Sequence, residues 1–129
     1  MLKPGLTGTA TLVVSAEHTA EALGSGLVPV FATPRMVSLM EQAAVDALKD
    51  QLEAGQTTVG TFLEVSHLAA TPVGMPVRAE AVLTAVEGRM LTFRVSARDA
   101  VEKIGEGTHR RTIVSVALFL ERVSAKSAR

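Results

Sequence analysis

Glu41 is the carboxylate whose position in the sequence most strongly suggests chemistry. It lies four residues after Val37 and three before Ala44, so helical spacing places it in line with apolar side chains rather than on the solvent face. A carboxylate that is partly removed from water is suited to proton transfer. Glu41 is therefore either a functional group or a residue at the edge of the apolar stripe that reaches water or a basic partner.

Thr33 and His67 each allow two interpretations. Thr33 stands directly before Pro34 at the predicted start of the same helix. Its hydroxyl could cap the helix, or it could lie beside free backbone N–H groups that stabilise an oxyanion. His67 lies among apolar and small residues. It is either a half-buried structural histidine, or a general base or a group that orients a hydroxyl. Residue types alone favour the cap and the structural histidine.

A basic segment opens the last predicted strand. It contains His109, Arg110 and Arg111, which could contact a phosphate, a carboxylate or a thioester substituent, or could be solvated charges of a turn. No two histidines are spaced as a ligand pair and the chain has no cysteine, so no metal site is expected. The sequence contains no GxGxxG, P-loop, GxSxG or HExxH motif.

A long helix and a set of strands must position these residues. The helix is predicted to run from Thr33 to about Leu52, roughly 28 Å at 1.5 Å per residue, with Gly55 as its stop. Gly60 is predicted to be a bulge or a site of close approach. The remaining predicted elements are strands at 7–15, 57–70, 77–86, 90–97 and 108–123, a short helix at 16–23, a loop at 24–29, turns at 71–76, 87–88 and around 103–105, and a fraying tail at 124–129.

The order of these elements predicts the fold class. Four consecutive strands joined by short turns indicate an antiparallel meander, and the helix must bury its apolar stripe on that sheet. The expectation is one α+β domain over residues 1–129, with a curved antiparallel sheet of about five strands wrapped around one long central helix.

Composition limits the classes of function. Hydrophobic residues make up 47% and charged residues 20%, as in a soluble globular protein. A net charge of zero argues against nucleic acid or an anionic membrane as a partner. The four aromatic residues are all Phe, so a stacking platform for bases or sugars is hard to build. With no cysteine, no signal-peptide pattern and no long apolar run, we expect a cytoplasmic protein.

Three segments of the chain carry a resemblance to a known family. They are Phe31-Ala32-Thr33-Pro34 leading into Met36–Glu41, then Val65–Gly74, then Gly107–Arg111. In order and spacing they resemble the fluoroacetyl-CoA thioesterases, a family of hotdog proteins, over nearly the whole chain. The resemblance implies the hotdog fold, hydrolysis of an acyl-CoA thioester, coenzyme A as part of the substrate with no other cofactor, and a homodimer or a higher oligomer.

The resemblance also implies the site residues. The family's catalytic threonine, glutamate and histidine correspond to Thr33, Glu41 and His67, and an arginine on the last strand corresponds to Arg111. A glycine beside the substrate falls near Ala69. His109 is expected to contact the substrate next to Arg111. The fluoroacetyl-specific enzyme gates its site with Phe side chains on a lid; the equivalent stretch, 23–30, has none, which argues against fluoroacetyl-CoA as the natural substrate.

Helix geometry adds one inference about assembly. Thr33 and Glu41 are about 12 Å apart along a helix axis, so they cannot easily touch the same carbonyl from one straight helix. A site at a two-fold interface could bring Thr33 of one subunit near Glu41 of the other.

Three alternatives remain open. A non-catalytic acyl-CoA-binding hotdog module would bind ligand without hydrolysing it. A hydratase acting on enoyl-CoA would carry an Asp and His pair five residues apart, which the sequence lacks. A purely structural interaction protein would need a large exposed apolar patch.

Overall fold

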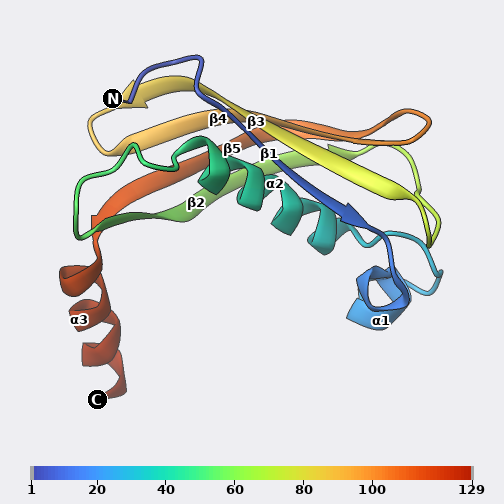
Figure 1. Cartoon of the computed structure of the whole chain (residues 1–129). Coiled ribbons are helices and arrows are strands. Elements are labelled where there is room, and N and C mark those ends of the chain that lie inside the picture. Colours follow the sequence, from blue (N-terminus) through green and yellow to red (C-terminus); the bar gives the residue numbers. More distant parts are fainter. Residues whose placement is uncertain (1, 129) are drawn as a thin grey trace.

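One antiparallel sheet curves around helix α2 (Figure 1). The computed structural model describes residues 2–128. Its strands are β1 (Thr7–Val13), β2 (Gln56–His67), β3 (Pro76–Glu87), β4 (Met90–Asp99) and β5 (Lys103–Ser115). Its helices are η1 (Ala16–His18), α1 (Ala20–Leu23), α2 (Thr33–Ala47) and α3 (Val116–Ser127). The predicted α+β class, with about five strands around one long helix, is confirmed.

Helix α2 packs one face on the concave side of the sheet. Its buried residues recur at helical spacing: Met36, Leu39, Met40, Ala43, Ala44 and Ala47. The small residues let the sheet come close, and a Cβ at Gly8 of β1 would overlap the backbone of Ala43 and Ala47. This contact holds the helix at a fixed depth below the sheet.

The helix ends at Ala47, earlier than the predicted Leu52. Leu48 is its buried C-cap, and Asp50 has a φ of 63°, in the left-handed region that a right-handed helix cannot include. The 15 residues of α2 therefore span about 22 Å.

Strand β2 lies at an edge of the sheet, which differs from the predicted four-strand meander. The strand order is β1-β3-β4-β5-β2, so only β3, β4 and β5 form a meander, and β2 pairs with β5. The chain between β2 and β3 does not make a hairpin: the Phe31 N–H donates to the Thr71 carbonyl, and Val30 pairs with Pro72. The predicted bulge at Gly60 is confirmed by a register shift between Gly60 and Phe62.

The C-terminal segment is a helix: the predicted strand over 108–123 is confirmed for 108–115 and wrong for 116–123, and the fraying tail is wrong for 124–127. Strand β5 ends at Ser115, whose side chain caps α3 by accepting from the Leu118 N–H. Strong helix formers follow, and α3 runs to Ser127; Arg129 lies outside the described residues. The turn predicted around 103–105 lies instead at 100–102, where the Asp99 carboxylate accepts two backbone N–H groups.

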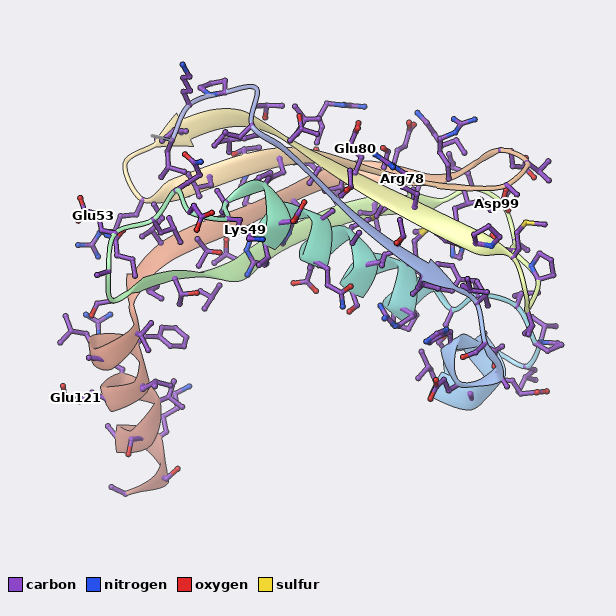
Figure 2. The ribbon with its side chains drawn as sticks, viewed as in Figure 1. Lys49, Glu53, Arg78, Glu80, Asp99 and Glu121 are labelled. Carbon is purple, nitrogen blue, oxygen red and sulfur yellow. The ribbon has the colours of Figure 1, made fainter. Side chains whose placement is uncertain are left out.

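The two faces of the sheet differ as the alternation of β3 predicts. Val77, Ala79 and Leu83 are buried against the core, whereas Arg78 and Glu80 project from the face opposite α2 (Figure 2). Among residues 2–128, no helix is long and apolar enough to cross a membrane.

Candidate active site

Thr33 and His67 form a close pair at the start of α2. The Thr33 Oγ1 lies 2.7 Å from the His67 Nδ1. The helix N-cap is Ala32, with φ −75° and ψ 139°, and Thr33 is already helical. The interpretation of Thr33 as the cap is therefore wrong: its hydroxyl bonds an imidazole on β2.

The Thr33–His67 pair lines a cavity of about 400 Å³. The loop after α1 and the end of β2 supply its other walls: Ala20, Ser25, Gly26, Val28, Val30, Phe31, Leu68, Ala69 and Ala70. Apart from the hydroxyls and the imidazole, the side chains of this lining are apolar, and most of them are small. Ala69, predicted to lie beside the substrate, is part of this wall.

The surroundings of His67 favour its neutral form. Desolvation by burial lowers the pKa of His67. In a neutral imidazole one nitrogen donates and the other accepts, so an Nδ1 that accepts from the Thr33 hydroxyl leaves the proton on Nε2. Among the described residues, the buried Nε2 has no hydrogen-bond partner. His67 can therefore orient the hydroxyl or take up its proton.

Glu41 belongs to a second cluster, further along α2. Its Oε2 lies 3.6 Å from the Arg111 Nη1, and the Glu41 side chain is 37% exposed. Arg111 is buried and tied to Thr58, with Nε donating to the hydroxyl at 2.8 Å and Nη2 to the carbonyl at 3.0 Å. Burial lowers the pKa of Arg111, and the Glu41 carboxylate opposes this effect. The guanidinium is a fixed positive group that holds the carboxylate.

His109 lies behind Arg111, inside the core. It is completely buried, and its Nδ1 donates to the Phe62 carbonyl at 2.9 Å. Its Nε2 is then an acceptor for the Arg111 Nη1, at 3.2 Å. Desolvation lowers the pKa of His109, which agrees with a neutral ring. The expected substrate contact of His109 is therefore replaced by contacts within the protein that position Arg111.

Gly60 completes the second cluster and was not among the predicted site residues. A Cβ at this position would lie 2.9 Å from the Glu41 Oε2 and 3.2 Å from the His109 Cε1. With any side chain at position 60, the carboxylate would have to move from its place beside Arg111. Its place in the middle of a strand was the available signal, because a glycine there often marks close approach. Thr58 gave no such signal in the sequence.

The two clusters stay apart within one chain. Thr33 and Glu41 are separated by about 12 Å along α2. His67 and Gly60 are seven residues apart on β2, which is roughly 23 Å at 3.3 Å per residue. Glu41 does not line the cavity that Thr33 and His67 share. One subunit therefore holds the three predicted catalytic residues in two separate places.

The family model of the fluoroacetyl-CoA-specific thioesterases matches residues 14–117 of the chain. The chain belongs to this family. The fluoroacetyl-CoA thioesterase of Streptantibioticus cattleyicolor is 48% identical over 98 residues, which are 76% of this chain and 70% of that protein. A crystal structure of a variant of the fluoroacetyl-CoA-specific thioesterase FlK, in complex with fluoroacetate and CoA, is similar with a TM-score of 0.86 and 41% identity, and the match covers 92% of this chain and 99% of that one.

The same fold occurs in more distant relatives of this family. A hot-dog-like protein from Thermanaerovibrio acidaminovorans has a TM-score of 0.88 and 26% identity, over 97% of this chain and 93% of that one. The predicted hotdog fold is confirmed. As a member of the fluoroacetyl-CoA-specific thioesterase family, the protein is an acyl-CoA thioesterase, a thioester hydrolase.

Proposed function

We propose that the protein hydrolyses the thioester of a small or medium acyl-CoA, with Thr33, Glu41 and His67 as its catalytic residues. The observation that carries the proposal is the 2.7 Å contact between the Thr33 hydroxyl and His67 at a cavity of about 400 Å³. The CoA and fluoroacetate bound to the FlK variant support coenzyme A as part of the substrate. A cytoplasmic location and the lack of any other cofactor stay predictions.

The acyl carbonyl would bind at the start of α2, beside Thr33. Pro34 has no N–H, and the N–H groups of Arg35 and Met36 donate to the Ala32 carbonyl. This leaves the Thr33 N–H as the backbone donor at this helix end that can polarise the carbonyl oxygen, because the proton of the Thr33 hydroxyl is directed at His67. His67 would orient the hydroxyl and move its proton.

Glu41 would supply the reactive carboxylate. It would either activate a water molecule or attack the carbonyl carbon to form an anhydride that water then hydrolyses. Both routes need an oxygen held in a defined direction. Arg111 and the open space at Gly60 provide this, and His109 positions Arg111.

A homodimer would bring the two clusters together. Strand β2 is an edge strand with exposed Phe62 and Leu63, so its backbone is free to pair with a second copy. An antiparallel pairing of two β2 strands across a two-fold axis places the Gly60 end of one beside the His67 end of the other. Glu41 of the partner subunit would then face Thr33 and His67.

A thiol-release assay over a panel of acyl-CoAs tests this function. The panel runs from acetyl- and fluoroacetyl-CoA to medium-chain substrates, beside Glu41→Gln and the exposed neighbour control Gln42→Ala. Loss of a catalytic carboxylate should lower turnover by about 10²–10⁴-fold, while the control keeps wild-type turnover. Wild-type turnover in Glu41→Gln would remove Glu41 from the mechanism. Binding without thiol release from any acyl-CoA would favour the non-catalytic module.

A further inference from the structure

Helix α3 carries an apolar stripe that its own chain covers only in part. Val116, Leu120 and Val123 recur at the spacing i, i+4, i+7, so they share one face of the helix. Their exposed fractions are 37%, 57% and 50%, and no residue of α3 is buried. Figure 1 shows α3 standing away from the sheet, on the side where α2 lies. A helix in this position needs a partner to bury its stripe.

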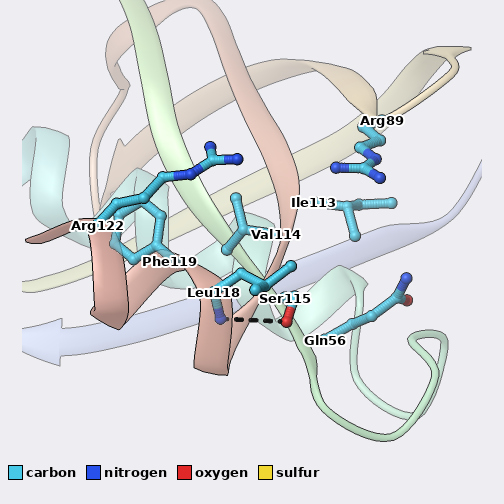
Figure 3. Close-up of a pocket in the computed structure, with 8 residues that line it drawn as sticks. All are labelled: Gln56, Arg89, Ile113, Val114, Ser115, Leu118, Phe119 and Arg122. Atoms are coloured by element: carbon cyan, nitrogen blue, oxygen red, sulfur yellow. Dashed lines mark hydrogen bonds between the residues drawn. The ribbon is translucent and has the colours of Figure 1, made fainter.

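A different face of α3 turns toward the rest of the chain. Leu118, Phe119 and Arg122 line a cavity of about 140 Å³, with Gln56 of β2 and Arg89 among its other walls (Figure 3). The stripe of Val116, Leu120 and Val123 is not part of this lining. Leu118 is 58% exposed all the same, so its own chain covers neither this face nor the stripe completely.

A second exposed apolar region lies at the opposite end of β2. It consists of Leu23, Leu27, Val28 and Leu68, with Leu27 92% exposed, and it borders the cavity of Thr33 and His67. The segment 24–30, which we call the lid, contains no charged residue. In Figure 1, α1 and α3 lie at opposite ends of the sheet and on the same side of it.

The dimer of the proposed function brings these two ends together, and the inference rests on that function. Gly60 contacts Glu41, so delivering Glu41 to the partner's His67 requires Gly60 of one strand to lie opposite His67 of the other. Gln56, four residues before Gly60, then lies beyond the end of the partner's β2, on the side of the partner's lid. Ser115, from which α3 departs, pairs with Gln56. The 12 residues of α3 span about 18 Å, enough to cover the lid.

We propose that α3 of each subunit packs its stripe of Val116, Leu120 and Val123 on the lid of the partner, and so forms the outer wall of the partner's acyl cavity. Both surfaces are apolar and uncharged, and each leaves its side chains in water in the isolated chain. The surface that covers the stripe therefore belongs to a second copy of this chain. The lid has no Phe side chains to close the cavity. In their place, α3 of the partner would limit the length of the acyl group that the cavity accepts.

Engineered cysteines test the contact, because the chain has none of its own. Leu27→Cys chains are refolded or co-expressed with Leu120→Cys chains and treated with a short bis-maleimide. The matched control replaces Leu120→Cys by Thr84→Cys, an exposed position on β3. The first mixture should give a cross-linked dimer much faster than the control. Equal rates, or cross-linking of Leu120→Cys chains with each other, would overturn the proposal.

A charge-substituted helix gives a second, kinetic measurement. The double variant Leu120→Glu, Val123→Glu changes exposed positions only, so the chain should fold and remain a dimer by light scattering. Its KM for the longest accepted acyl-CoA should rise roughly tenfold, the size expected when one buried aliphatic contact is lost. A wild-type KM would count against the contact. If the enzyme is a dimer but the Leu27→Cys and Leu120→Cys chains do not cross-link, only this inference is overturned. If a monomer is fully active, the proposed dimer is overturned as well.

Discussion

The two polar clusters along α2 are held in very different ways. Thr33 and His67 share one short hydrogen bond at the wall of a cavity, and among the described residues the His67 Nε2 has no partner. Arg111, by contrast, is buried and bonded to Thr58 and His109, and it holds Glu41. The cluster around Arg111 is preorganised by the core, whereas the Thr33 cluster is shaped by a lid.

This difference explains why the chemistry is divided between two places. A carboxylate needs a fixed charged partner, which the interior of the sheet supplies through Arg111. An acyl group needs an opening and a helix N-terminus, which lie at the other end of β2. Neither cluster holds a complete catalytic set, so pairing of two chains becomes part of the proposed mechanism.

The largest predicted effect comes from mixing two inactive variants, which tests whether the catalytic residues of one site come from two subunits. Dimers of Thr33→Val, His67→Ala chains with Glu41→Gln chains contain one intact site only if Glu41 acts across the interface. Random pairing should then restore about a quarter of the wild-type thioesterase activity, from variants that are each nearly inactive alone. Thiol release from the co-expressed mixture measures this. No recovery would show that the three residues act within one chain.

Gly60→Ala tests the preorganised cluster, with an intermediate effect. The new methyl group would lie 2.9 Å from the Glu41 Oε2, so the carboxylate must turn away from its position beside Arg111. A displacement of about 1 Å should lower kcat by roughly tenfold to a hundredfold. The control is Thr61→Ala, at the exposed neighbouring position. If kcat is unchanged in Gly60→Ala while the fold is intact, the orientation of Glu41 does not limit turnover.

The two histidines give the smallest predicted effect, on stability. Desolvation lowers the pKa of both His67 and His109 below the value of about 6.5 for an exposed imidazole. Below that pH the unfolded chain binds more protons than the folded chain. The stability contributed by the neutral rings is therefore complete above about pH 6.5 and is lost as the pH falls toward the folded-state pKa values.

Urea unfolding between neutral and mildly acidic pH measures this loss. The urea midpoint of the wild type should decrease below about pH 6.5. His109→Gln should remove more of the decrease than His67→Gln, because the His109 ring is completely buried. A midpoint that does not change over this range would contradict the burial of neutral imidazoles.

The local pattern of the sequence predicted most of the elements. Helical spacing indicated α2, and alternation indicated the buried side of β3, because both periodicities follow from backbone geometry alone. Glu41 lies at the edge of the apolar stripe, 37% exposed and beside Arg111. The glycine inside β2 indicated a bulge. The same reasoning predicted a strand where the structure has α3. The run from Val116 to Leu120 is apolar enough for either structure, and the cap at Ser115 favours the helix.

What the sequence by itself determined is the α+β class, the start of the central helix and the family resemblance that joined Thr33, Glu41 and His67. The tertiary structure alone decided the rest. Strand order placed β2 at the edge of the sheet, burial assigned His109 to Arg111 rather than to substrate, and the position of the Glu41 carboxylate left little room for a side chain at residue 60. Pairing between distant strands depends on the packing of the whole chain, whereas spacing within one element does not.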